Sequence, residues 1–140
     1  MGATSEHFSN AELACHCGCG MNDCTQALVD ALEAFRTSVG QPVTVDDAYR
    51  CPIHNAAIHG ATHSEHVQGI AADIKVAGKT AAELEAVAKT IPAIHGIGRD
   101  DFRNYIHIDT RSTPVEWCYN AAGAWVHYFP PPEPSAPIYA

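Results

Sequence analysis

The residues that decide the fold are Ser64-Glu65-His66-Val67-Gln68-Gly69-Ile70-Ala71-Ala72-Asp73. They run into the apolar segment 70–76, which is expected to form a central strand. Because side chains alternate between the faces of a strand, Asp73 is expected to project away from its apolar side, toward a cleft. A neutral imidazole and a carboxylate are ordinary zinc ligands, so His66 and Asp73 are candidate metal ligands. The plainer interpretation is a loop histidine followed by a strand aspartate.

A second segment supplies a third candidate ligand. It reads Asn104-Tyr105-Ile106-His107-Ile108-Asp109-Thr110-Arg111. Its alternation and its aromatic and β-branched residues predict a strand, with Tyr105, His107 and Asp109 on one face. Two histidines and one carboxylate with an open fourth position are typical of catalytic zinc, so the predicted ligand set is His66, Asp73 and His107.

The order of these motifs resembles the M15 family of zinc D-Ala-D-Ala peptidases, and most closely the branch of murein carboxypeptidases and endopeptidases. The resemblance is carried by Ser64-x-His66-x-x-Gly69-x-Ala71-x-Asp73 and His107-Ile108-Asp109. Further matches to this branch are Tyr49-Arg50-Cys51-Pro52, Asn55 and Phe8-Ser9-x-x-Glu12-Leu13 with its Cys-rich loop. Together they cover residues 8–111.

The resemblance implies an α+β fold: a small single domain with a central antiparallel sheet, helices packed on one side, and zinc in the cleft. The length of 140 residues suits one domain. The expected organisation is an N-terminal extension (1–7), the peptidase domain (8–129) and a proline-rich tail (130–140). Capping and periodicity predict helices at 11–15, between Thr25 and Gly40, at 52–58, and from Thr80 toward Pro92. Strands are expected at 42–45, 70–76, 95–99 and 104–111, with a hairpin around 120–123.

Composition excludes some classes of function. The formal net charge is −8 and no basic patch stands out, which argues against nucleic acid as a partner. No run is long and apolar enough to span a membrane. Residues 1–7 lack the basic start and apolar segment of a secretory signal, so the expectation is either a mature form or another route to the wall, such as the one holins provide for phage lysins. The protein is expected to be a monomer.

The cysteines are unevenly distributed. Cys15, Cys17, Cys19 and Cys24 crowd one loop, whereas Cys51 and Cys118 are isolated. The even count is compatible with disulfides, and the Cys-x-Cys-x-Cys-x4-Cys spacing differs from the paired Cys-x2-Cys of common zinc sites. Disulfides in an oxidising compartment are therefore favoured over a second, structural zinc in the loop from Cys15 to Cys24.

The resemblance assigns roles to two further residues. Arg50 matches the arginine of the family's Tyr-Arg motif, where a guanidinium holds the developing oxyanion or a substrate carboxylate. Its alternative role is a surface ion pair with Asp46 or Asp47. Ser64 matches a substrate-binding position and would otherwise be a cap or turn residue. The chain also departs from many relatives, with Asp47-Ala48 in place of Ser-Gly.

The general base is the main departure from the family pattern. Many relatives carry an acid three positions before the last histidine ligand, where this chain has Asn104. Asp109 is the first candidate, because it lies on the face of His107 about 6–7 Å further along the strand. Its rival role is to orient the second nitrogen of a ligand histidine. Asp101 is the second candidate, and its alternative is a solvated turn residue.

The implied substrate is the peptide stem of peptidoglycan, cut at a bond that involves a D-amino acid. Carboxypeptidase, cross-link endopeptidase and L-Ala-D-Glu lysin activities all occur on this scaffold, and the sequence does not choose among them. Such an enzyme acts on the cell wall, in the periplasm or outside the cell. Two other hypotheses are a non-catalytic, zinc-containing wall-binding module of the same fold, and a disulfide-rich structural protein without zinc.

Overall fold

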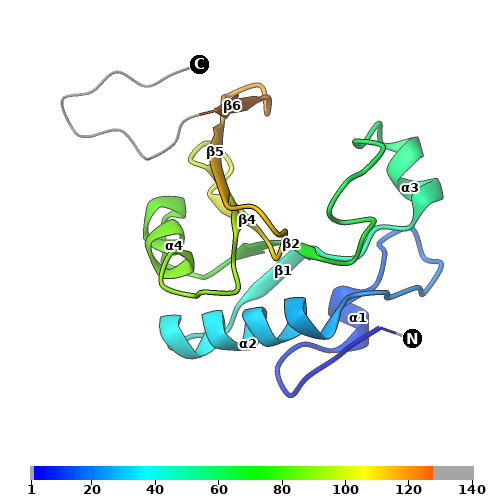
Figure 1. Cartoon of the computed structure of the whole chain (residues 1–140), viewed down its shortest axis with the longest axis horizontal. Coiled ribbons are helices and arrows are strands. Elements are labelled where there is room, and N and C mark those ends of the chain that lie inside the picture. Colours follow the sequence, from blue (N-terminus) through cyan, green and yellow to red (C-terminus); the bar gives the residue numbers. More distant parts are fainter. Residues whose placement is uncertain (1, 128–140) are drawn as a thin grey trace.

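A six-stranded mixed sheet with the order β1-β2-β4-β3-β5-β6 forms the centre of the computed structural model, which describes residues 2–127 (Figure 1). The strands are β1 (Thr44–Asp47), β2 (Ala71–Lys75), β3 (Gly96–Asp100), β4 (Tyr105–Asp109), β5 (Val115–Tyr119) and β6 (Trp125–His127). Each predicted strand and the predicted hairpin is present, with boundaries shifted by one or two residues. The predicted tail, 130–140, lies outside the described residues.

The sheet is not purely antiparallel, which corrects the prediction. β5 runs parallel to β3, with Gly96 opposite Val115 and Arg99 opposite Cys118. The cause is the path of the chain: β4 returns beside β3 as a hairpin, and residues 110–114 then carry the chain around the start of β3 to its other edge. β4 and its flanking turns form the crossover that a parallel pair requires, so no helix is needed between β3 and β5.

The helices begin where capping residues predict. They are α1 (Asn10–Leu13), α2 (Gln26–Val39), α3 (Pro52–Ala57) and α4 (Ala81–Ala88). The side chains of Thr25 and Thr80 accept hydrogen bonds from the first turns of α2 and α4. α4 ends earlier than predicted, because the N–H groups of Thr90 and Ile91 bond three residues back and tighten the chain ahead of Pro92.

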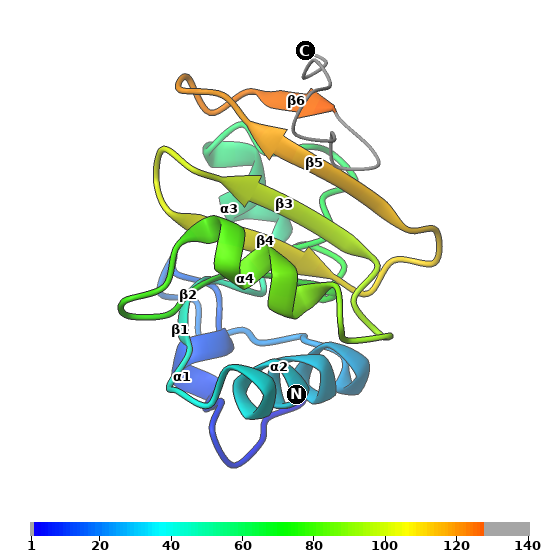
Figure 2. The ribbon, with the colours of Figure 1, turned by 90° about the vertical axis from the view of Figure 1, so that its left-hand side faces the viewer.

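Helices lie on both sides of the sheet, not on one side as predicted. α2 and α4 form a layer on one side, whereas α3 and the loop after it lie on the other (Figures 1 and 2). α3 is short and exposes Ile53, so it contributes little to the core. Its place follows from Arg50-Cys51-Pro52, which leads the chain away from β1 to the wall of the candidate site.

The helix layer buries one face of β2 and β4. Ile74 pairs with Ile106, and both are fully buried. The other fully buried side chains in this core include Leu28, Leu32, Phe35, Leu84 and Ile108. The alternate residues of the same strands, Asp73 and His107, also pair with each other, so the opposite face carries the polar groups.

Replacing Ile74 with alanine tests the core. Ile74 is fully buried and Ile53 is 84% exposed, so the two isoleucines form a matched pair. We expect Ile74→Ala to lower the free energy of unfolding by about 2–5 kcal/mol, because it removes buried methyl groups and leaves a cavity. Ile53→Ala should change it by less than about 0.5 kcal/mol. Urea titration followed by circular dichroism measures both, and equal losses would contradict this packing.

Candidate active site

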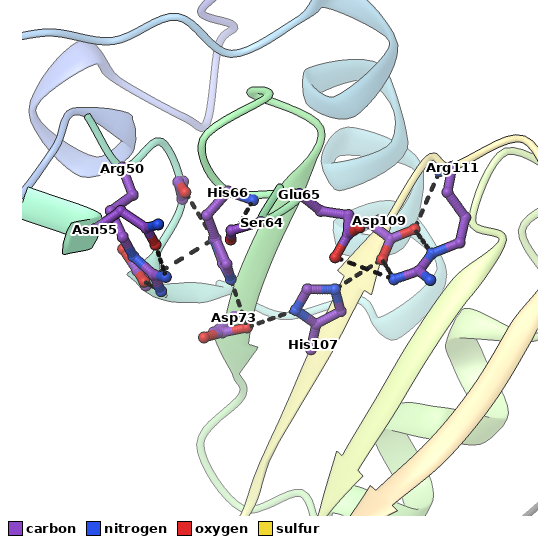
Figure 3. A network of polar contacts seen from close by, with 11 residues as sticks. Arg50, Asn55, Ser64, Glu65, His66, Asp73, His107, Asp109 and Arg111 are labelled. Atoms are coloured by element: carbon purple, nitrogen blue, oxygen red, sulfur yellow. Dashed lines mark hydrogen bonds and ion pairs between the residues drawn. The ribbon is translucent and has the colours of Figure 1, made fainter. Parts of the chain in front are cut away.

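Three side chains predicted as metal ligands converge on one face of the sheet. Asp73 of β2 and His107 of β4 are direct cross-strand neighbours, and Asp73 Oδ1 lies 3.1 Å from His107 Nδ1. His66 comes from the loop before β2, and its Nε2 lies 3.3 Å from the same oxygen. Figure 3 shows the carboxylate between the two rings. The donor atoms of all three residues lie within 4.8 Å of one another.

The loop holds His66 rigidly. The ring is buried and its Nδ1 lies 2.7 Å from the carbonyl oxygen of Ala48, which fixes Nδ1 as the donor and leaves Nε2 facing Asp73. Ser64 Oγ accepts a hydrogen bond from the His66 N–H. Gly69 closes the loop with φ of 74°, and a Cβ there would lie 2.1 Å from the carbonyl oxygen of Asp23. The turn therefore requires glycine.

Carboxylates flank both nitrogens of His107. Nε2 lies 2.8 Å from Asp109 Oδ2, opposite the contact of Nδ1 with Asp73. Burial lowers the pKa of the His107 imidazole, but its hydrogen bonds to Asp109 and Asp73 outweigh burial and raise the pKa to about 9. Burial raises the pKa of Asp73, but the charges and hydrogen bonds of His66 and His107 hold it below its usual range. The carboxylates of Asp73 and Asp109 therefore stabilise a positive charge at the position of His107.

The donor set fits zinc. Nitrogen and oxygen ligands about 2.0–2.1 Å from a tetrahedral zinc ion lie about 3.3 Å from one another. The separations from Asp73 Oδ1, 3.1 Å to His107 Nδ1 and 3.3 Å to His66 Nε2, match this spacing. In addition, the second nitrogen of each ring is already occupied, by the Ala48 carbonyl oxygen and by Asp109, as is usual for metal-bound histidines.

Asp109 lies where the rival, orienting role would place it, beside Nε2 of His107. It is fully buried, and besides His107 it accepts hydrogen bonds from the backbone N–H, Nε and Nη2 of Arg111. Burial raises the pKa of Asp109, but His107 and Arg111 outweigh burial and hold it below its usual range. This geometry favours the rival role over the first prediction, because the contacts of Asp109 are with His107 and Arg111 and it is not among the residues that line the pocket.

The structure does not bring Asp101 or Asn104 to the site. Asp101 is exposed in the β3–β4 turn, where it accepts a hydrogen bond from Arg99 Nε at 2.8 Å. Asn104 has φ of 57° and accepts a hydrogen bond from the Ala81 N–H at the start of α4. Asparagine tolerates this left-handed conformation, so the residue at the family's acidic position serves the turn and the helix.

Glu65 is a carboxylate that sequence reasoning missed. It lies between Ser64 and His66, is half-buried, and lines the same pocket as the three candidate ligands. Its carboxylate oxygen belongs to a group with donor atoms of His107 and Asp109 that all lie within 4.8 Å of one another. Arg111 Nη2 lies 3.3 Å from Glu65 Oε1 and so bridges Glu65 and Asp109 (Figure 3). The only sequence signal for Glu65 is its position inside the motif, between Ser64 and His66.

The pocket has a volume of about 360 Å³ and includes the other two predicted site residues, Arg50 and Ser64. Arg50 Nη1 donates to Asn55 Oδ1 at 2.9 Å, and Nη2 donates to Asp47, so the ion pair with Asp47 does form. The ion pair and the pocket position coexist, because Asp47 and Asn55 hold the guanidinium in the wall. Ser64 both supports the His66 loop and lines the pocket.

Aromatic side chains form the opposite wall. They are Tyr105 of β4, Trp117 and Tyr119 of β5, and Trp125 of β6. The Trp117 ring lies 5.1 Å from the His107 ring and 5.1 Å below the Arg111 guanidinium carbon. The C-terminal hairpin is thus part of the pocket. Tyr128 and Phe129, the next aromatic residues in the sequence, lie outside the described residues.

Glycines in β3 leave room for these side chains. A Cβ at Gly96 would lie 2.2 Å from the Asp109 carboxylate, and one at Gly98 would lie 2.5 Å from the Trp117 indole. Between them, Ile97 points into the core. The side chains of Asp109 in β4 and Trp117 in β5 can therefore pack over β3 at the two glycines, while Ile97 packs in the core on the other face.

The predicted disulfides do not form. All six cysteines lie in the described residues, and each is a free thiol. Cys51, which is isolated in sequence, lies beside the N-terminal Cys loop, with its Sγ 3.7 Å from Cys17 Sγ. The two cysteines are 34 positions apart in the sequence, so the local spacing of the loop did not indicate that they are neighbours.

The fold and this donor set define a metallopeptidase site. Residues 6–109 match the sequence model of the family described as Peptidase M15, and the chain belongs to that family. M15 peptidases are zinc-dependent, and the family acts on peptides of the cell wall. No curated protein matches the chain. Within residues 2–127, no helix has the length and apolar character needed to cross a membrane.

Removing single imidazoles tests the ligand set. We expect His66→Ala and His107→Ala to lose the zinc of this site, because each removes one of three protein donors. His63→Ala is the matched control, since His63 is exposed and lies three residues from His66. Zinc is measured by plasma mass spectrometry after dialysis, together with Zn–N scattering at about 2.0 Å by X-ray absorption. Retention of that scattering in both variants would contradict the assignment.

Proposed function

We propose that the protein is a zinc-dependent peptidase that cleaves stem or cross-link peptides of peptidoglycan at a bond involving a D-amino acid, as a carboxypeptidase or endopeptidase of the kind that phage lysins also use. One observation carries the proposal. A His-Asp-His donor set, a fixed guanidinium and a half-buried carboxylate face one pocket in a member of the M15 family. The proposed site of action is the cell wall, and the proposed active form is a monomer with a domain spanning residues 8–129.

His66 Nε2, Asp73 Oδ1 and His107 Nδ1 are the atoms that would hold zinc. When bound, zinc supplies a Lewis acid that polarises the scissile carbonyl and makes a water molecule more acidic. The residues behind them keep the set in place. Asp109 fixes the ring of His107, and the Ala48 carbonyl oxygen fixes that of His66.

Glu65 is the proposed general base. Its carboxylate lines the pocket beside His107, whereas Asp109 is buried behind the ring. In this role Glu65 takes a proton from the attacking water and returns it to the leaving amine. Arg111 contacts both carboxylates, so it sets the distance between the orienting group and the base. Glu65 replaces Asp109 and Asp101 in the catalytic role first expected of them.

Arg50 is the proposed electrophilic group. Asp47 and Asn55 each accept from one of its terminal nitrogens, so the guanidinium reaches the pocket in a fixed orientation. Its Nε is buried and has no hydrogen-bond partner among the described residues. A guanidinium held in this way stabilises a developing oxyanion or grips a terminal carboxylate of the substrate. Ser64 is proposed to contact the same end of the substrate.

The walls of the pocket suit a stem peptide. Arg50 and Arg111 line the pocket beside the acidic Glu65 and Asp73, and a guanidinium can bind a carboxylate of the substrate. The aromatic wall of Tyr105, Trp117, Tyr119 and Trp125 offers flat apolar surface to the methyl groups and peptide planes between those carboxylates. Both features support a stem peptide as the proposed substrate.

Digestion of purified sacculi tests the proposed function. We expect zinc-loaded protein to release fragments whose masses locate the bond: free D-alanine for a carboxypeptidase, or monomers from cross-linked dimers for an endopeptidase. The His66→Ala variant is the control. Binding to sacculi without any released fragment would overturn the enzyme in favour of a wall-binding module.

Two isosteric variants separate the base from the orienting carboxylate. We expect Glu65→Gln to lower kcat by about 10²–10⁴-fold with zinc retained, because an amide cannot take the proton. Asp109→Asn should weaken zinc affinity by about 10–100-fold, with activity recovered as zinc is added. Glu6→Gln, far more exposed, is the control for Glu65. Normal turnover in Glu65→Gln would remove it as the base.

Arg50→Lys tests the guanidinium. Lysine keeps the charge but loses the planar fork that Asp47 and Asn55 hold. We expect kcat/KM to fall by about tenfold or more while zinc content is unchanged. Arg36→Lys on α2, outside the pocket, should leave both values unchanged. Wild-type kinetics in Arg50→Lys would reduce Arg50 to its ion pair with Asp47.

A further inference from the structure

Four thiols meet where the N-terminal loop reaches the start of α3. Cys15 Sγ lies 3.5 Å from Cys17 Sγ, and Cys17 Sγ lies 3.7 Å from Cys51 Sγ. With Cys19, the four sulfur atoms all lie within 4.8 Å of one another. Figure 1 shows the loop after α1 passing below α3 on the side of the molecule away from α4. None of the four thiols lines the candidate active site.

We propose that Cys15, Cys17, Cys19 and Cys51 bind a second, structural zinc ion as a tetrathiolate. Four sulfur ligands about 2.3 Å from a tetrahedral zinc ion lie about 3.8 Å from one another. The distances of 3.5 Å and 3.7 Å are close to this value. Closed sets of four thiolates are typical of structural zinc, and thiolates select zinc over harder cations.

Mutual proximity distinguishes this cluster from a disulfide framework. Disulfides join sulfurs in separate pairs, whereas Cys17 has neighbours on two sides, Cys15 and Cys51. All six cysteines are free thiols. The Cys24 and Cys118 thiols are directed elsewhere, toward the carbonyl oxygens of Leu13 and Val126. The cluster therefore takes four of the six cysteines, and its membership differs from the loop of Cys15 to Cys24 that spacing alone suggested.

Backbone groups support the sulfurs. The Cys51 N–H donates to Cys15 Sγ at 3.3 Å, and the His54 N–H donates to Cys51 Sγ at 3.4 Å. Such hydrogen bonds orient metal ligands and favour the thiolate form. Cys15 and Cys51 are buried, whereas Cys17 and Cys19 are exposed, so an ion can enter from the solvent side.

Two glycines let the loop fold around the cluster. Gly18 and Gly20 have φ of 88° and 76°, a region that residues with a Cβ rarely adopt. Gly18 lies between Cys17 and Cys19, and Gly20 follows Cys19. The turns at these glycines allow the thiols of the loop to face one point. The Cys-x-Cys-x-Cys spacing, unusual for zinc, is thus accommodated by left-handed glycines in place of the usual two-residue gap.

A zinc ion here would fix one wall of the candidate active site. Cys51 follows Arg50 directly and is the N-cap residue of α3. Cys15 follows α1, whose Leu13 carbonyl accepts a hydrogen bond from the Tyr49 N–H. The metal would thus join the N-terminal loop to the segment 49–52 at a point one residue from the guanidinium.

The zinc content of full-length protein purified with reductant tests the proposal. We expect two zinc ions per chain, with zinc X-ray absorption showing a Zn–S shell at about 2.3 Å beside the Zn–N/O shell. In His66→Ala, one zinc should remain with sulfur ligands only. In Cys17→Ser/Cys19→Ser, the sulfur shell should disappear while the site at His66 keeps its zinc. Cys24→Ala and Cys118→Ser are the cysteine controls and should keep both ions.

A measurement on wild-type protein covers the case in which the double variant fails to fold. An organomercurial that caps thiols should release one equivalent of zinc, detected with a colorimetric chelator, and leave the other bound. Wild-type protein without a Zn–S shell would overturn the proposal, as would intact Cys15, Cys17, Cys19 or Cys51 disulfides after native purification. Neither result bears on peptidase activity, so failure here is distinct from failure of the proposed function.

Discussion

The pairing of β2 with β4 is the constraint on which the site and the core both depend. Asp73 opposite His107 and Ile74 opposite Ile106 are adjacent rungs of one ladder, so a single register sets both faces. Slipping it by one residue would turn the candidate ligands into the helix layer and the isoleucines toward solvent. The burial of Ile74 and Ile106 therefore stabilises the arrangement that brings two charged ligands together.

Around this pair, hydrogen bonds hold the polar side chains of the site in place. His66 is held by Ala48 after β1, Arg50 by Asp47 and Asn55, and His107 by Asp109 with Arg111 behind it. The donor atoms are fixed before any ligand arrives, which lowers the ordering cost of binding. The cluster of thiols extends the same arrangement to the outer side of the Arg50 segment.

Local signals predicted most elements and the three candidate ligands, because caps, alternation and motif spacing are properties of neighbouring residues. Thr25, Thr80 and Gly40 mark helix ends, and Asp73 and His107 project from strands as alternation requires. Long-range proximity was not predictable in this way. The parallel β3–β5 pair, α3 on the second side of the sheet, and Cys51 beside Cys17 each depend on where the chain returns. Glu65 was missed because a residue between two motif positions carries no periodic signal.

Gly96 and Gly98 lie directly against two side chains of the site, Asp109 and Trp117. Because glycine has no side chain, Asp109 and Trp117 pack directly on the backbone of β3 at these two positions. A saturation library across the domain should therefore show two kinds of intolerance. Positions such as Glu65 would fail for loss of chemistry even when the replacement has the same volume, whereas Gly96 and Gly98 would reject every replacement, alanine included, on volume alone.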